Sequence, residues 1–223
     1  YGDDISTFFS LINPDSNSLF DVTRNAPLFF RSNHTVAPHN AMVSLSDLVK
    51  ESWPMNADAT PFSPKLPNLQ FDEASPSRGQ ENAHTIQVTY EKDNYAAAYA
   101  YDASSRQFTR FYNGSPQTDA GGAQVMASNI IIQFVPLSYP AGTLSLPAID
   151  TTGSGQMDAF IDGTHISGVW VRDGIDAWVR YLDQNGEPLV LYPGSTFVHY
   201  VPMDMEVTFS DEAGNETTLS AAL

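Results

Sequence analysis

The fold class of this chain is decided by Asn129-Ile130-Ile131-Ile132-Gln133-Phe134-Val135, its longest apolar run. The run is far shorter than the roughly 20 residues that a membrane-spanning helix needs, and it has the length of a strand. Apolar side chains follow one another here instead of alternating with polar ones, so both sides of the strand are suited to a core. We therefore predict a central strand that is buried on both faces of a sheet.

Short strands with turn signals between them are predicted on both sides of this run. Strands are predicted at residues 86–90, 95–101 and 108–112. The last two, joined through Asp102-Ala103-Ser104-Ser105 and followed by a turn at Asn113-Gly114, predict a hairpin. Further turn signals recur at intervals of about ten residues. They are Gly153-Ser154-Gly155, Asp162-Gly163, Asp173-Gly174 and Asn185-Gly186. Residues 205–209 and 216–219 predict a last hairpin, and the whole pattern is typical of an antiparallel β-sandwich or a barrel-like sheet.

One predicted strand has two chemically different faces. Tyr95, Tyr99 and Tyr101 share one face, and the alanines at 96, 98 and 100 share the other. A face of alanines lets another layer approach closely, whereas tyrosines cover apolar surface and leave their hydroxyls in water. We therefore expect another layer against the alanines and solvated hydroxyls on the tyrosines.

The amino-terminal part differs in character from the rest. Apolar spacing predicts helices over residues 3–12 and 44–53, which we interpret as the helical remnant of a preceding domain at 1–53. Prolines are dense over 54–83, which predicts an extended connector, and the antiparallel β domain is expected over 84–223. The expected fold class is therefore mainly β (α+β), an antiparallel β-sandwich or barrel-like sheet with a short helical N-terminal segment.

Composition narrows the classes of partner. The chain has 26 acidic and 10 basic residues, a formal net charge of -16, and no cysteine. Such a charge repels phosphate backbones and anionic lipid headgroups, so we expect no nucleic-acid partner and no direct membrane binding. The lack of cysteine excludes disulfides and thiolate chemistry, and no phosphate loop, dinucleotide fingerprint or serine elbow occurs. We expect no cofactor and no metal.

Several motifs occur in an order that resembles a known family. They are Arg31, Pro38-His39-Asn40, Tyr99-Ala100-Tyr101-Asp102, Arg110, Asn113-Gly114, Asp119, Asn129-Ile130-Ile131-Ile132, Gly153-Ser154-Gly155, Asp162-Gly163, Ile166-Ser167-Gly168-Val169-Trp170, Tyr181-Leu182-Asp183, Asn185-Gly186 and Leu191-Tyr192-Pro193-Gly194-Ser195-Thr196-Phe197. Together they resemble the YerB-like family of bacterial lipoproteins, whose function is unknown. The resemblance covers most of the chain from about Arg31 to Pro202, and the order of the motifs is more specific than any one of them.

The resemblance implies the carboxy-terminal domain of a longer protein. Such a protein is exported, is anchored to the membrane through a lipidated cysteine that this chain lacks, and carries an amino-terminal domain before this one. The implied location is extracytoplasmic. Two features depart from the family: Phe197 stands where a tryptophan is expected, and the tail from Met203 runs past the usual end. The family implies no catalytic residues.

The candidate binding residues each have a structural alternative. His39 and Asn40 lie in a polar loop after Arg31, where a histidine can act as a general base or bind a ligand, or can simply pack while Asn40 caps the turn. Arg106 and Arg110 are predicted to share a strand face with Phe108, where they can clamp a carboxylate or phosphate. They can equally pair with an acid such as Asp102 or Asp119.

The aspartates and large aromatic residues also have two interpretations. Asp158, Asp162 and Asp173 can supply paired carboxylates for glycoside hydrolysis, although aspartates followed by glycine are more typical of turns. Trp170 can belong to an aromatic platform for a glycan or peptide, or to the core, with its ring over the bare backbone of Gly168.

The function predicted from these residues is binding and not catalysis. We expect an extracytoplasmic binding or scaffolding domain that recognises a cell-envelope protein or wall polymer. The candidate binding residues are Arg31, His39, Asn40, Arg110, Asp119 and Trp170. The alternative is an envelope hydrolase that uses His39 with acidic partners, which requires His39 within hydrogen-bond reach of a second polar side chain in a cleft.

Overall fold

The structure is a computed structural model that describes residues 29–33, 36, 40–44, 68–91, 95–139, 148–174 and 177–221. The chain divides into two compact units, residues 1–66 and 67–223. In the first unit, β1 (Phe29–Arg31) pairs with β2 (Ala41–Val43) in an antiparallel ribbon. The other described strands belong to the second unit.

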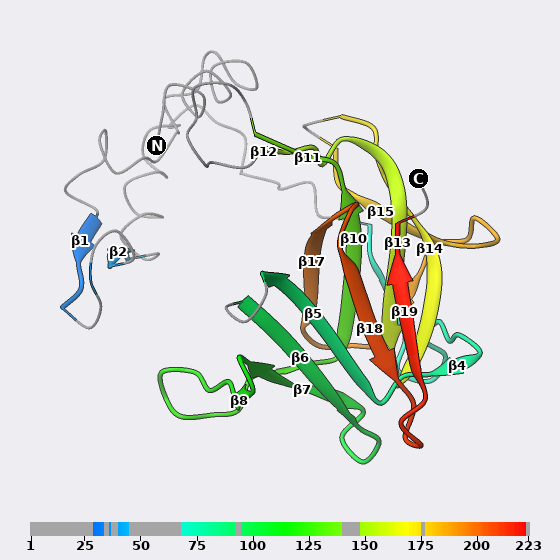
Figure 1. The fold of residues 1–223 in the computed structure, drawn as a ribbon, viewed down its shortest axis with the longest axis horizontal. Coiled ribbons are helices and arrows are strands. Elements are labelled where there is room, and N and C mark those ends of the chain that lie inside the picture. Colours follow the sequence, from blue (N-terminus) through cyan, green and yellow to red (C-terminus); the bar gives the residue numbers. More distant parts are fainter. Residues whose placement is uncertain are drawn as a thin grey trace, which may run out of the picture. The chain divides into compact units, whose positions relative to one another are not determined.

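One large sheet of the second unit is built around the predicted central strand (Figure 1). Its order is β15-β14-β13-β10-β17, with β4 paired to β14. The strands are β4 (Glu81–Asn82), β10 (Asn129–Val135), β13 (Gly153–Ile161), β14 (Thr164–Arg172), β15 (Arg180–Asp183) and β17 (Thr196–Pro202). Every residue of β10 is buried, and the strand pairs with β13 on one side and β17 on the other. The prediction of a central strand over 129–135 is confirmed.

The second large sheet has the order β19-β18-β5-β6-β7-β8, with β9 paired to β7. Its strands are β5 (Thr85–Glu91), β6 (Tyr95–Asp102), β7 (Gln107–Tyr112), β8 (Ser115–Pro116), β9 (Met126–Ala127), β18 (Glu206–Ser210) and β19 (Glu216–Ser220). The predicted hairpins β6–β7 and β18–β19 are confirmed. Two further pairs are parallel β3 (Gln70–Phe71) with β16 (Val190–Leu191), and antiparallel β11 (Leu137–Ser138) with β12 (Ala148–Ile149).

The central strand β10 supplies side chains to two cores. Ile130 and Phe134 point into a core that the two large sheets share, together with residues of the second sheet such as Phe108. Ile131 points into a core on the opposite face of the first sheet, which also contains Trp170. Fully burying one such side chain contributes about 1.5–3 kcal/mol to the free energy of folding. Because successive side chains of β10 enter different cores, the strand is apolar at successive positions.

The expected fold class is wrong. All elements among the described residues are strands, with no helix, so this part of the chain is all-β and not α+β. The barrel alternative is also wrong, because no sheet closes: the first ends at β15 and β17 and the second at β19 and β8. Nor is the first sheet wholly antiparallel, since β10 and β17 run parallel.

The predicted helices fall on residues that the structure does not describe. The stretch 3–12 lies outside the described residues, and so does 44–53 except for Ser44, which follows β2 without helical backbone. A helical amino-terminal segment is therefore unsupported. In the described ranges there is also no helix long and apolar enough to cross a membrane.

The tyrosine face of β6 packs inward, which contradicts the expectation of solvated hydroxyls. Tyr99 has 1% of its surface exposed and Tyr101 packs against the shared core, whereas Ala96, Ala98 and Ala100 are half-buried on the other face. Tyr99 lies opposite Ile86 in the β5–β6 register, so the apolar face of β5 and the tyrosines of β6 lie on one side. The hydroxyls stay hydrogen-bonded because polar partners reach them inside the protein.

Candidate functional site

The two inward tyrosines of β6 end in different polar networks. The hydroxyl of Tyr101 donates to Asp162 at 2.9 Å, and the hydroxyl of Tyr99 lies 2.6 Å from Nε2 of His199. Buried tyrosines of this kind bring an apolar ring and a polar tip to the same place. Each network therefore joins the second sheet to the first.

Asp162 and Gly163 form the turn between β13 and β14. Both have positive φ, 49° and 72°, which is the backbone of a two-residue hairpin turn that favours Asp-Gly. A Cβ on Gly163 would clash with the ring of Tyr101, so the absence of a side chain at this position makes room for the tyrosine. The predicted turn at Asp162-Gly163 is confirmed, and it sets the aspartate against β6.

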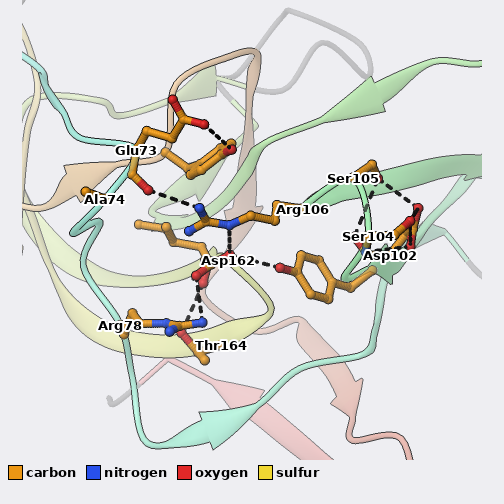
Figure 2. A network of polar contacts seen from close by, with 12 residues as sticks. Glu73, Ala74, Arg78, Asp102, Ser104, Ser105, Arg106, Asp162 and Thr164 are labelled. Atoms are coloured by element: carbon orange, nitrogen blue, oxygen red, sulfur yellow. Dashed lines mark hydrogen bonds and ion pairs between the residues drawn. The ribbon is translucent and has the colours of Figure 1, made fainter.

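The carboxylate of Asp162 is an almost fully buried acceptor, with 3% of its side chain exposed. It accepts hydrogen bonds from the hydroxyl of Tyr101 and from Nε of Arg106 at 2.7 Å, and Nη2 of Arg78 lies 2.6 Å from Oδ2 (Figure 2). Burial acts to raise the pKa of Asp162, but the bonds from Arg106 and Tyr101 and the nearby charge of Arg78 lower it overall. The carboxylate is therefore ionised, and it accepts hydrogen bonds or ion pairs from three side chains of two segments, the β6–β7 hairpin and the segment before β4.

Arg106 is positioned by a turn and not by a strand. The sequence alternation predicts that it shares a face of β7 with Arg110, but it precedes β7 and has a φ of 56°. Its Nη1 donates to the carbonyl of Glu73 at 3.0 Å, and its guanidinium lies 4.2 Å from the ring centroid of Tyr192. With the bond to Asp162, these contacts hold the arginine on several sides (Figure 2).

This network borders a hollow of about 690 Å³, which is within the size range of small-ligand sites. Residues from segments far apart in the sequence line it, including Arg78, His84, Arg106, Asp162, Asp211 and Glu212. The lining carries both signs of charge and few large apolar side chains. We take this hollow, which we call the Asp162 hollow, as the candidate functional site.

The second network surrounds His199 on the inner face of β17. Arg110 donates from Nε to the Tyr99 oxygen at 3.1 Å, and the Tyr99 hydroxyl lies 2.6 Å from Nε2 of His199. On the other side of the ring, Nδ1 of His199 lies 2.8 Å from the Tyr90 hydroxyl, so each ring nitrogen forms a hydrogen bond with a tyrosine. Burial, aided by the charge of Arg110, lowers the pKa of His199 to about 4, so the imidazole is neutral. Arg110, a predicted binding residue, contributes here to a contact between the two sheets.

A third network surrounds His165 on β14. Its Nδ1 lies 2.9 Å from Glu81 and its Nε2 lies 2.8 Å from the buried Asp158. Burial alone lowers the pKa of His165, but the bonds to Asp158 and Glu81 raise it overall. Ser167 donates to Asp158 at 2.9 Å and is 3.5 Å from the imidazole, so the aspartate, and not the histidine, holds the serine. This arrangement does not activate a serine nucleophile.

Two other predicted site residues, Trp170 and Asp119, do not line the Asp162 hollow. Trp170 is 1% exposed, its Nε1 donates to the Phe134 carbonyl at 2.8 Å, and its ring covers Gly155 instead of Gly168. Asp119 accepts bonds from the backbone nitrogens of residues 121 and 123, and so closes its own turn.

The amino-terminal candidates belong to the first unit. Nη1 of Arg31 donates to Oδ1 of Asn40 at 2.8 Å, and Nδ2 of Asn40 donates to the carbonyl of Ser32 at 3.1 Å. The structure thus brings Arg31 and Asn40 together across the β1–β2 ribbon. His39 lies outside the described residues, so the hydrolase alternative stays a prediction.

Sequence reasoning missed the role of Asp162, Arg78 and Arg106 as one group. The Asp-Gly pair signalled a turn, but no local signal indicated that the aspartate is buried or which arginines reach it. Within the described ranges, no three histidine, aspartate or glutamate side chains group in a way that could hold a metal ion.

Comparison with known proteins identifies the family. The model described as "Protein of unknown function (DUF3048) C-terminal domain" matches residues 86–198. The chain belongs to this family. The matched part of this DUF3048 domain includes Tyr101, Arg106 and Asp162 and excludes Arg78.

A solved structure shares the fold. The crystal structure of YerB protein from Bacillus subtilis is similar with a TM-score of 0.68 and 20% sequence identity, over 88% of this chain and 64% of that chain. The chain therefore spans 64% of the length of the YerB chain it matches, and the likeness supports the fold alone. No curated protein matches the sequence.

Proposed function

We propose that this domain is an extracytoplasmic binding or scaffolding domain that recognises a cell-envelope protein or wall polymer through the Asp162 hollow. The observation that carries the proposal is the occupied carboxylate of Asp162. It accepts from Tyr101 and Arg106 of the β6–β7 hairpin and from Arg78 of the segment before β4, and so joins these two segments to the β13–β14 turn before any ligand arrives. A binding site whose walls are already positioned loses little freedom on binding.

Binding is favoured over catalysis by the state of the acidic group. A general base works best with a pKa near the working pH, whereas the pKa of Asp162 is lowered by its hydrogen bonds and by the nearby guanidinium charge. The oxygens of Asp162 already accept three donors, and two of these donors are permanently charged guanidinium groups. Asp162 thus serves as an anchor for the arginines of the hollow.

The location is proposed from the family resemblance together with the charge of the chain. The YerB-like pattern implies an exported lipoprotein, and the chain lacks cysteine, which suits proteins outside the cytoplasm that do not depend on disulfides. The net charge of -16 opposes binding to polyanions and favours partners with basic or neutral groups. An envelope protein or a wall polymer that presents such groups fits these conditions.

The test compares two exposed arginines. Arg78 is 61% exposed and borders the hollow, whereas Arg180 is 54% exposed and pairs with Asp173 elsewhere on the surface. The purified chain, Arg78→Ala and Arg180→Ala are each incubated with isolated cell-wall sacculi and, separately, with detergent-solubilised envelope proteins, and the retained fraction is measured.

We expect the wild type and Arg180→Ala to be retained equally and Arg78→Ala to be retained at least tenfold more weakly. Equal thermal melting curves for the two variants would establish that both remain folded. Retention of the wild type at background level in both assays, or equal retention of all three chains, would refute the proposal.

A further inference from the structure

We infer that the Asp162 hollow recognises the free carboxylate of a short peptide, and that Arg78 is the residue that binds it. The inference rests on the proposed function of the hollow and names the group that the hollow selects.

Arg78 is a fixed guanidinium that still has donors to offer. It contacts Asp162 through Nη2 at 2.6 Å, which holds the side chain in one place although 61% of it is exposed. A guanidinium has five N–H donors, and in the described part of the chain its partner is Asp162 alone. The remaining donors of Arg78 can form the parallel pair of hydrogen bonds that a carboxylate accepts.

Arg106, the second arginine of the hollow, uses its guanidinium for contacts within the protein. Arg106 donates to Asp162 and to the carbonyl of Glu73, and its guanidinium lies over the ring of Tyr192 (Figure 2). Its side chain is 32% exposed, about half the value for Arg78. Arg106 therefore stabilises the lining of the hollow, and Arg78 is the arginine that can bind a ligand.

The surrounding charges select against phosphate and other multiply charged anions. Asp162 already compensates one of the two arginines, and Asp211 and Glu212 also line the hollow. Each further negative charge on a ligand is repelled by these carboxylates and by the net charge of -16 of the chain. A single carboxylate on an otherwise neutral or positively charged molecule avoids most of this repulsion.

Two other residues that line the hollow suit the rest of a short peptide. Asn82 offers both a donor and an acceptor to peptide groups, and Glu212 is exposed and can attract an amino terminus. The volume of about 690 Å³ accommodates a small ligand, whereas the hollow offers few large apolar contacts for an apolar one. A peptide carboxylate suits Arg78, and peptide amide or ammonium groups suit Asn82 and Glu212.

The experiment uses isothermal titration of the full chain with four probes. These are L-alanyl-L-alanine, L-alanyl-D-alanine, L-alanyl-L-alanine amide and inorganic phosphate. The variants are Arg78→Ala and the control Arg180→Ala, both first shown by thermal melting to be folded. The two stereoisomers distinguish the sources of the group: preference for the D-terminal probe indicates a wall peptide, and preference for the L-terminal probe indicates a protein carboxy terminus.

We expect a free dipeptide to bind at least tenfold more tightly than the amide and than phosphate. Arg78→Ala should remove this difference, and Arg180→Ala should keep it. The inference is overturned if the amide or phosphate binds as tightly as the free dipeptide, if Arg78→Ala still discriminates, or if neither dipeptide binds at 20 mM. Retention on sacculi or by envelope proteins without this discrimination would leave the proposed function standing and remove only the carboxylate assignment.

Discussion

Acidification should destabilise the domain through His199 in particular. The imidazole is buried between Tyr90 and Tyr99 with Arg110 nearby, and its pKa in the folded chain is about 4 instead of 6.5. Protonation would make Nε2 a donor toward a hydroxyl that already accepts from Arg110, so two cationic groups would face one oxygen. The neutral form is therefore the one that the fold favours.

The magnitude follows from the shift in the pKa of His199. A lowered pKa means that the unfolded chain takes up the proton first, so the stability from this residue is complete above about pH 6.5 and is lost as the pH falls toward about 4. At about 1.4 kcal/mol per unit, the loss amounts to roughly 3 kcal/mol. His165 acts in the opposite direction: its pKa is raised, so its contribution is complete below the unfolded value and is lost as the pH rises through the folded value.

The assay is urea unfolding at several pH values between 7.5 and 4 for the wild type, His199→Gln and His165→Gln. Glutamine keeps a donor and an acceptor between the tyrosines but does not titrate. The advantage of the wild type over His199→Gln should shrink by roughly 3 kcal/mol on acidification, while its advantage over His165→Gln should grow. If the wild type and His199→Gln lose stability in parallel, His199 is not held neutral and the argument is wrong.

Four other substitutions test the core, the Asp162 turn and, as a matched comparison, the turn at Gly114. Trp170→Ala should lower the free energy of unfolding in urea by about 3–5 kcal/mol, because the side chain is buried; an unchanged value would place it on the surface. Tyr101→Phe should cost about 1–3 kcal/mol by thermal melting, since Asp162 loses a buried donor, and no change would mean that the bond is dispensable. Gly114→Ala should cost about 1–2 kcal/mol from positive φ alone. Gly163→Ala should cost more, because its Cβ also meets the Tyr101 ring; equal losses in urea unfolding would contradict that contact.

Some features of the fold and site were within reach of the sequence, and others were not. The turn at Asp162-Gly163 was predictable because Asp-Gly fits a two-residue hairpin through its own backbone preferences. The same is true of Asp183, which caps its own turn, whereas Asp119, which the sequence offered as a binding residue, also closes a turn. For Trp170 the sequence left a binding platform and the core open; the ring is buried, and the glycine beneath it lies on the neighbouring strand.

The sequence by itself determined where strands and turns occur, because alternation, apolar runs and turn chemistry act between residues close together in the chain. The buried strand at 129–135 and the hairpin ended by Asn113-Gly114 are of this kind. Only the tertiary structure decided that β17 lies parallel to β10, that Tyr99 and Tyr101 face inward, and that Arg78 and Arg106 meet at Asp162. These choices depend on which distant segment covers each face of a sheet, and the free energy of that packing is shared among residues far apart in sequence.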